Sequence, residues 1–240
     1  MISVIVPTLN EAGTLPRLLG RCRPASEMEV VVSDGGSEDG TPDTAERLGA
    51  RVVRSERGRG RQMNAGARVA RGDVLLFVHA DAEPPHCFQA DIASILGRPG
   101  VVAGAWLLSI DAAGASYRMI ERLANLRSRV FQLPYGDQGF FIRRADFDFL
   151  GGFSDAPIME DVEMVRRCRR RGRIVTAGSR MLVSARRWKK EGWLHTTARN
   201  LLVLTLYSAG VSPRRLLALY PPHRISASGA PSAGVSDAGR

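Results

Sequence analysis

Acidic side chains stand at the ends of two hydrophobic segments and at the start of a later helical segment. Asp34 and Asp81 each follow an apolar run, and Asp161 belongs to a Glu160-Asp161 pair. In an open α/β sheet, ligands bind in the crevice at the carboxyl ends of the strands. Carboxylates there suit a contact to a base or ribose, a ligand for a divalent cation and an acceptor for a proton. We expect these three acids to converge in one cleft of an enzyme that acts on a nucleotide-linked substrate.

Polar residues directly follow the first predicted strand. The Thr8 hydroxyl, the Asn10 amide and the nearby backbone N–H groups are suited to bind a nucleobase or a ribose, although a capped turn explains the segment equally simply. The Asp34 carboxylate can accept a hydrogen bond from the N3–H of uracil or from a ribose hydroxyl, or it can form an Asx-turn. Because Ser37 extends the same acidic, glycine-rich loop, we favour binding for Asp34.

Residues 79–83 read His-Ala-Asp-Ala-Glu. Strand-like alternation places His79, Asp81 and Glu83 on one side. The Asp81 carboxylate suits Mg²⁺, which binds oxygen ligands and is usually shared with substrate phosphates. His79 suits Mn²⁺ better, but a hydrogen-bonded histidine at the end of a strand is an equally good interpretation.

Two further positions have both a functional and a structural interpretation. Arg61, near a predicted helix start, can reach a diphosphate with the help of that helix N-terminus, and a solvated arginine is an equal alternative. Acidic residues in a first helical turn each stabilise the helix by about 0.3–1 kcal/mol. Together with the other acids, however, Asp161 becomes the candidate general base.

The elements that must position these residues follow from hydrophobic periodicity. Short apolar runs alternate with helix-period segments in the first half, which is typical of βαβ units in a parallel sheet. A dinucleotide-binding fold is excluded because Gly-x-Gly-x-x-Gly does not follow the first strand. Predicted strands cover 2–6, 29–34, 51–54, 74–79, 101–110, 140–142, 174–176 and 181–183, and predicted helices cover 15–22, 42–48, 62–70, 117–131, 162–171, 194–209 and 213–219.

Pro7 is expected to end the first strand, and Thr41 to cap the helix over 42–48. We expect one domain over residues 1–224, with a nucleotide-binding half of about 1–110 and an acceptor half of about 111–224. Residues 225–240, dominated by Ala, Ser, Gly and Pro, are expected to be a disordered tail.

Composition limits the partners of the chain. The net charge of +10 first suggests nucleic acid, but 32 of the 34 basic residues are arginines spread along the chain, which a GC-rich coding bias also explains. We therefore expect no nucleic-acid partner. Three cysteines without paired spacing indicate neither a disulfide framework nor a zinc site and favour the cytoplasm. No signal peptide is expected, and the apolar run 201–211 is shorter than the ~20 residues that span a bilayer.

Together, these segments resemble family 2 glycosyltransferases of the GT-A fold. The resemblance covers about residues 1–190, and its ordered combination is specific where each piece alone is not. It implies an α/β fold with a Rossmann-like, mostly parallel central sheet flanked by helices, followed by C-terminal helices. The segments that carry it are 5–11, 32–41, 80–82, 136–139 and Glu160-Asp161.

The resemblance implies transfer of a sugar, with inversion, from a nucleoside-diphosphate donor (a UDP-linked one) to an acceptor hydroxyl. It further implies a divalent metal, Mg²⁺ or Mn²⁺, that offsets the charge on the leaving diphosphate. In this scheme Asp81 binds the metal, with His79 as a second candidate ligand, and Asp161 deprotonates the acceptor. The implied nucleotide site comprises Pro7, Thr8, Asn10, Glu11, Asp34, Ser37, Arg61 and Asp81, and the implied acceptor side comprises Gln138, Glu160, Arg187 and Trp188.

Two departures from the family pattern bear on the metal and the product. His79 stands where the family's metal motif begins with Asp, which leaves the identity of the metal open. The Gln-x-x-Arg-Trp element of polymerising members is reduced to Ser-Ala-Arg-Arg-Trp at 184–188, which favours a single addition. A role for Trp188 in the core is nearly as good an interpretation as one at the acceptor. The segment resembles small soluble bacterial members.

Two other classes of function stay open. A nucleotidyltransferase acting on sugar phosphates shares the architecture, but it normally carries a basic glycine-rich loop where Asn10-Glu11 stand here. A non-catalytic basic module for RNA or anionic lipid would show binding that weakens steeply with salt. The arginine run 166–171 and the apolar C-terminal helices also leave room for peripheral membrane contact with a lipid acceptor.

Overall fold

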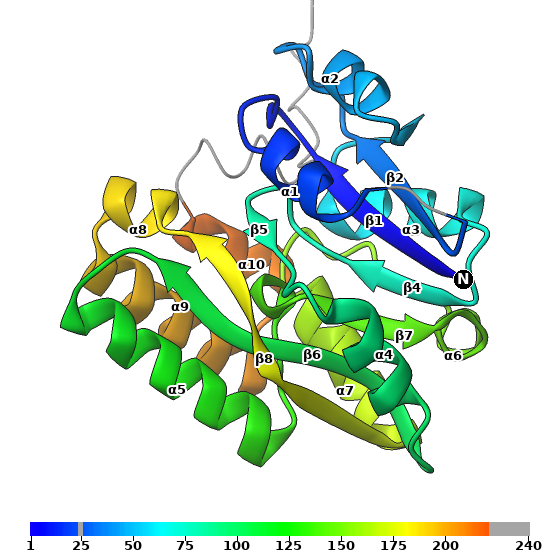
Figure 1. Ribbon diagram of the computed structural model, residues 1–240. Coiled ribbons are helices and arrows are strands. Elements are labelled where there is room, and N and C mark those ends of the chain that lie inside the picture. Colours follow the sequence, from blue (N-terminus) through cyan, green and yellow to red (C-terminus); the bar gives the residue numbers. More distant parts are fainter. Residues whose placement is uncertain (24–25, 221–240) are drawn as a thin grey trace, which may run out of the picture.

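A computed structural model describes residues 1–23 and 26–220, except the side chain of Arg187. The expected tail, 225–240, lies outside the described residues. One eight-stranded sheet is covered by helices on both faces (Figure 1). Its strands are β1 (Ile2–Thr8), β2 (Met28–Asp34), β3 (Arg51–Arg54), β4 (Val74–Phe77), β5 (Ala82–Glu83), β6 (Val101–Asp111), β7 (Phe140–Arg143) and β8 (Arg173–Ser184).

The helices fill the connections between the strands and the C-terminal segment. Most link consecutive strands, as expected for a sheet with crossover connections. They are α1 (Leu15–Arg21), α2 (Thr41–Arg47), α3 (Arg59–Val69), α4 (Phe88–Leu96), α5 (Ala115–Phe131), the 3₁₀ turn η1 (Gly136–Gln138), α6 (Arg144–Phe149), α7 (Glu160–Arg171), α8 (Arg186–Glu191), α9 (Trp193–Ser208), α10 (Pro213–Leu216) and the 3₁₀ turn η2 (Leu217–Leu219).

The sheet runs in the order β3-β2-β1-β4-β7-β6-β8-β5. Strands β3, β2, β1 and β4 pair in parallel, β7 is antiparallel to both of its neighbours, and β6 and β8 pair in parallel again. Short β5 pairs antiparallel with the end of β8. The mostly parallel α/β sheet expected from the sequence is therefore confirmed.

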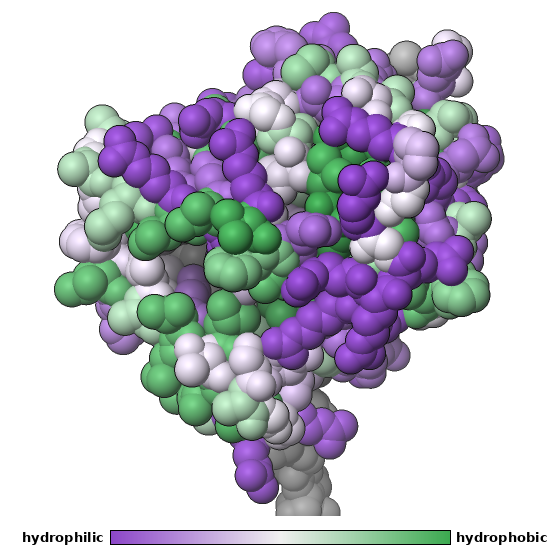
Figure 2. Space-filling view, turned by 90° about the horizontal axis from the view of Figure 1, so that it is seen from below, coloured by the Kyte–Doolittle hydropathy of each residue, from purple (hydrophilic) through white to green (hydrophobic). Residues whose placement is uncertain are grey.

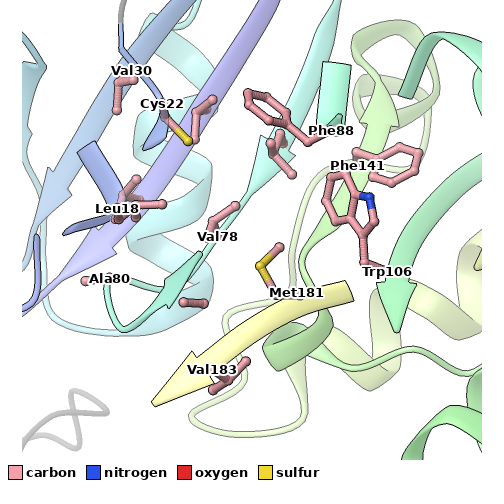
Figure 3. Packing of buried hydrophobic residues seen from close by; sticks show 14 of the residues in the cluster. Leu18, Cys22, Val30, Val78, Ala80, Phe88, Trp106, Phe141, Met181 and Val183 are labelled. Atoms are coloured by element: carbon pink, nitrogen blue, oxygen red, sulfur yellow. The ribbon is translucent and has the colours of Figure 1, made fainter. Parts of the chain in front are cut away.

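Alternate residues of the strands divide the core between the two faces of the sheet. Val4 and Val6 of β1 pack in the cluster beneath α1, α4 and α5, whereas Ile5 packs in the cluster beneath α3, α6 and α7. On the first face, Trp106 lies against Phe141 with ring centroids 4.7 Å apart (Figure 3). This rigid, close-packed sheet fixes the loops at its edge.

The first strand continues through Pro7, contrary to expectation. Pro7 and Thr8 pair with the last two residues of β2. Successive residues of β1 direct their backbone groups to opposite sides, and Ile5 accepts from Val78 just beyond the end of β4. The missing N–H of Pro7 therefore faces the side on which β4 has already ended, so no ladder bond is lost.

Two other expectations about element ends are wrong. Helix α2 begins at Thr41 after Gly40, so Thr41 is not its cap. Its hydroxyl instead donates to Asp39 at 2.5 Å and accepts from the Glu11 N–H. The two short strands expected over 174–183 are one strand, β8, whose register against β6 shifts between Ala105 and Leu107.

The two halves expected from the sequence interleave within this single sheet. Strand β7, from the second half, lies between β4 and β6 of the first half, and β8 lies between β6 and β5. The backbone of Ser184 also donates to the carbonyl of Asp81. Among the described residues, no helix is both long and apolar enough to cross a membrane.

Candidate functional site

A cleft of about 590 Å³ opens at the carboxyl ends of β1 and β4, within the range typical of small-molecule sites. Its walls come from the loop after β1, the start of α3, the β4–β5 loop, the start of α7 and the C-terminal helices. The predicted site residues that line it are Pro7, Thr8, Glu11, His79, Asp81, Glu160, Asp161 and Trp188.

Asp34 lies beside this cleft but is not among its lining residues. The side chain is 1% exposed, and its oxygens accept from the Thr8 hydroxyl, the Ser37 hydroxyl and the N–H groups of Gly36 and Ser37, at 2.5–3.2 Å. These four bonds fill the acceptor capacity of a carboxylate. The Asx-turn is therefore present, and a nucleoside contact at Asp34 requires the exchange of one of these bonds.

The loops after β1 and β2 are tied to each other. The Asn10 N–H donates to the Ser37 hydroxyl at 2.8 Å, and the Asn10 amide oxygen accepts from the Glu38 N–H at 2.9 Å. Asn10 adopts a left-handed backbone conformation with φ of 56°. Asn10 and Ser37 thus shape the rim of the cleft without lining it, and strain at such a position is common beside functional sites.

Gln62 of α3, which sequence reasoning missed, links the ends of β1 and β2. Its buried side-chain amide donates to the carbonyls of Thr8 at 2.7 Å and Ser33 at 3.0 Å. Buried backbone carbonyls beyond the sheet ladder need such partners. The only sequence signal is its place one turn into α3.

Asp81 lies in the turn between β4 and β5, and its backbone carbonyl accepts from Ser184. The alternation expected over residues 79–83 is wrong, because β4 ends at Phe77 and a turn follows. Glu83 consequently binds Arg17 and Arg21, away from the cleft lining. Within residues 1–23 and 26–220, no three His, Cys, Asp or Glu side chains are close enough together to hold a metal.

Asp161 stands in the first turn of α7 and faces the loop before β7. Its two oxygens accept from the N–H groups of Gly136 and Val162, both at 2.8 Å. A Cβ at Gly136 would lie 3.2 Å from Asp161 Oδ2 and 2.8 Å from His79 Nε2. A glycine is therefore needed where the backbone passes both side chains, and Asp161 is oriented by fixed donors.

Of Arg59 and Arg61, only Arg59 lines the cleft, to which Arg186 of α8 also contributes. Arg61 binds Asp155 and Glu56 on the surface and is absent from the cleft lining. Arg59, the first residue of α3, lines the cleft and pairs with Glu160 at 3.3 Å. This pairing raises the pKa of Arg59. The sequence Gly58-Arg59-Gly60-Arg61 indicated a segment suited to bind a diphosphate, but it did not indicate which of its two arginines faces the cleft.

Glu160 precedes Asp161 and is 1% exposed. Burial raises the pKa of the Glu160 carboxyl, Arg59 opposes that rise, and Asp161 adds to it. A raised pKa in the folded state means that the native protein binds this proton more tightly than the unfolded chain does. Native stability from this group is thus present at low pH and is lost as the pH rises through the folded pKa.

We expect Glu160→Gln to stabilise the fold increasingly from about pH 4 to pH 8, because the variant carries no buried charge. In this variant Arg59 loses its ionic partner but can still be solvated by water, because its side chain is 43% exposed. Urea unfolding across this pH range measures the difference in the free energy of unfolding. Glu163→Gln, on the same helix, is the control for the loss of a carboxylate from α7. A difference that shrinks as the pH rises would mean that the Arg59 pair outweighs burial.

The predicted acceptor side is only partly present. Gln138 is fully buried, binds Ser128, Arg127 and the backbone of Tyr135 and Trp106, and is not among the residues that line the cleft. The side chain of Arg187 lies outside the described part of the structure.

Trp188 belongs to the core and also borders the cleft. Arg186, which was not predicted, donates from Nη2 to both Glu11 oxygens at 2.9 and 3.0 Å. This contact joins the loop after β1 to α8 across the cleft wall. Two of the three expected acids, Asp81 and Asp161, therefore line one cleft, and the third supports its floor.

Comparison with known proteins supports one family. A sequence model of Glycosyl transferase family 2 matches residues 3–152. A PGL/p-HBAD biosynthesis glycosyltransferase of Mycobacterium tuberculosis is 39% identical over 90 residues, which cover 34% of this chain and 35% of that protein. Glucosyl-3-phosphoglycerate synthase of Mycolicibacterium paratuberculosis is 33% identical over 97 residues, which cover 35% and 30%. The matched part is about a third of these relatives.

Solved structures show the same fold at low identity. The mannosyltransferase PcManGT of Pyrobaculum calidifontis, in complex with GDP-Man and Mn²⁺, matches with a TM-score of 0.66 and 22% identity, over 95% of this chain and 68% of that one. Glucosyl-3-phosphoglycerate synthase of M. tuberculosis, in complex with Mn²⁺, UDP and phosphoglyceric acid, matches at 0.59 and 20%, over 98% and 80%. The expected GT-A fold is thereby confirmed.

Proposed function

The chain belongs to glycosyl transferase family 2, and from this we propose that it transfers a sugar from a nucleoside-diphosphate donor to an acceptor hydroxyl. We propose a UDP-linked donor and inversion at the anomeric carbon. The observation that carries the proposal is that Asp81 and Asp161 line one cleft together with Thr8 and Arg59. A candidate metal ligand, a candidate proton acceptor and a cation suited to the diphosphate thus line the same cleft.

The donor is proposed to lie against the ends of β1 and β4. Pro7, Thr8 and Glu11 face the nucleoside, and Asp34 supports Thr8 from beneath. Arg59 stands at the N-terminus of α3, where the helix dipole and an arginine together favour anionic oxygens. Arg59 thus takes the role in diphosphate binding that the sequence had suggested for Arg61.

The residues of this site fit a divalent metal only when the phosphates of the donor supply further ligands. The cleft offers the carboxylate of Asp81 but no three-ligand cluster among the described residues. Mg²⁺ and similar ions are commonly held by one or two carboxylates and substrate phosphates. We propose that Asp81 holds the ion, with His79 as a second ligand; when bound, it supplies charge stabilisation for the leaving diphosphate.

Asp161 is proposed as the general base. The acceptor oxygen forms a bond to the anomeric carbon as the bond from that carbon to the diphosphate oxygen breaks, which inverts the anomeric configuration. The hydroxyl proton passes to an Asp161 oxygen. Because Gly136 and Val162 donate to this carboxylate, its position is set before the acceptor binds.

Nucleotide sugars with and without Mn²⁺ test the proposal by thermal unfolding. A ligand at a hundred times its Kd stabilises by about 2.7 kcal/mol, which shifts Tm by about 5–10 °C in a protein of this size. We expect that shift with UDP-sugars and Mn²⁺, and a much smaller one with EDTA. ATP with Mn²⁺ is the control for general polyanion binding. Equal shifts for all nucleotides, or none, would contradict the proposal.

Two further parts of the proposal rest on the sequence. The cytoplasm remains the proposed compartment because the three cysteines lack the spacing of a disulfide framework. A small molecule or a lipid remains the proposed class of acceptor, and the shortened Ser-Ala-Arg-Arg-Trp segment at 184–188 favours one addition per acceptor.

A further inference from the structure

Three arginines of the run 166–171, which the sequence suggested as a surface for an anionic partner, make contacts within the fold. Arg166 binds the Ser208 hydroxyl and lies over the ring of Tyr207. Arg167 donates to backbone carbonyls and to Glu163, and Arg171 binds Asp146. These three arginines hold α7 to its neighbours, whereas Arg169 and Arg170 are exposed. A larger candidate surface for such a partner lies on α5 and α9.

Helix α5 exposes an apolar stripe to solvent. Met119, Leu123, Leu126 and Val130 follow one another at the spacing i, i+4, i+7 and i+11, which places them on one face of the helix. They are 46, 57, 57 and 60% exposed. The opposite face, which includes Ala124, packs on the sheet. Helix α5 therefore has apolar residues on both its inner and its outer face.

Helix α9 repeats this pattern. Leu194, Ala198 and Leu201 are exposed at the same spacing, and Leu202 beside them is 49% exposed. Helices α5 and α9 pack against each other. Figure 2 shows hydrophobic side chains gathered on the left of the underside of the molecule, the side on which α5 and α9 lie in Figure 1. We call the following exposed apolar residues of the two helices the α5–α9 face: Met119, Leu123, Leu126, Val130, Phe131, Trp193, Leu194, Ala198, Leu201 and Leu202.

The charges on these helices are of one sign at the surface. Arg122 and Arg129 are exposed on α5, adjacent in sequence to Leu123 and Val130. The only acid of α5, Glu121, is buried against the Ile110 N–H, and α9 contains no acid. Helix α8, directly before α9, adds exposed Lys189 and Lys190. Apolar stripes bordered by basic residues are typical of helices that lie in a membrane interface.

We propose that the α5–α9 face binds the surface of an anionic lipid bilayer. The exposed leucines would enter the boundary between headgroups and acyl chains, and Arg122 and Arg129 would contact the lipid phosphates. A second copy is the alternative occupant. A two-fold contact brings the same patch against itself, so the arginines of the two copies would meet with no exposed acid on α5 or α9 to offset them.

The position of α9 relates this face to the cleft. Asn200 and Leu204 line the cleft, whereas Leu201 and Leu202 between them are exposed. One helix thus contributes to the cleft wall and to the α5–α9 face. Docking would bring the cleft within one helix diameter, about 10 Å, of the lipid surface.

Vesicle sedimentation with the full chain tests the proposal. We expect binding to phosphatidylglycerol–phosphatidylcholine vesicles and about fivefold weaker binding for each of Arg122→Gln and Arg129→Gln, since a basic residue near an anionic surface contributes about 1 kcal/mol. The triple variant L123Q/L126Q/L201Q should lose at least tenfold. Its side chains are exposed, so Tm and the UDP-dependent shift should be retained.

The control is Leu48→Gln at the end of α2, an exposed leucine outside the face, which should bind vesicles as the unaltered chain does. No vesicle binding, or equal binding by the triple variant, would overturn the proposal. Sedimentation equilibrium without lipid would reveal a dimer that the triple variant dissociates, and this too would overturn it. Because the surface proposal is independent of sugar transfer, nucleotide binding separates its failure from failure of the proposed function.

Discussion

Asp161→Asn is expected to lower kcat by roughly 10²–10⁴-fold while the affinity for the donor stays unchanged. The amide oxygen can still accept one of the two backbone bonds, from Gly136 or Val162, but the side chain can no longer take a proton. Steady-state kinetics give kcat, and the metal-dependent thermal shift with a UDP-sugar reports donor binding. Loss of turnover with retained binding would assign Asp161 to the chemical step.

Glu163→Gln is the matched control for Asp161→Asn. Glu163 lies on the same helix and pairs with Arg167 at 2.7 Å, outside the cleft lining. We expect its turnover to remain within a fewfold of the unaltered protein. Normal turnover by Asp161→Asn would remove this residue as the base.

Asp81→Asn is expected to abolish the metal-dependent part of donor binding. Among the described residues, no three-carboxylate or histidine cluster is present to replace it. The Tm shift of about 5–10 °C expected for a UDP-sugar with Mn²⁺ should fall to the value seen with EDTA. Turnover should fall with it, because the charge on the leaving diphosphate is no longer offset.

Asp73→Asn is the control for a lost carboxylate, because Asp73 is 89% exposed and pairs only with the N-terminal amine among the described ion pairs. It should leave the Mn²⁺-dependent shift unchanged. His79→Ala separates the two candidate ligands: retained metal dependence in this variant would assign the metal to Asp81 alone. An undiminished shift in Asp81→Asn would contradict the proposed metal site.

The central strands were predictable because burial on both faces makes them continuous apolar runs. β3 was predicted to the residue, and β1 and β2 to within one or two residues at their ends. Elements held by tertiary contacts were not. β5 has only two residues and is stabilised by its pairing with β8. α4 begins shortly after two prolines, which obscured its N-terminal boundary in the sequence.

The positions of site residues were predictable where these residues directly follow a strand. They were not predictable where a turn or side-chain packing determines the orientation of the side chain. Asp81 and Asp161 reach the cleft as expected. Asp34 is satisfied within its own loop, because the Gly36 and Ser37 N–H groups both donate to its carboxylate. Which of Arg59 and Arg61 faces the cleft depends on the phase of α3, and no local pattern sets that phase.

The interleaved order of the strands limits how such an enzyme can be re-engineered. Exchanging the second half of this chain for that of a relative would replace β7 and β8 while retaining their neighbours β4, β5 and β6. Four hybrid seams would then have to match in register, because a slip of one residue turns every side chain to the opposite face. Chimeras that graft single loops, such as the one before β7, avoid all four seams and offer the more practical route to altered specificity.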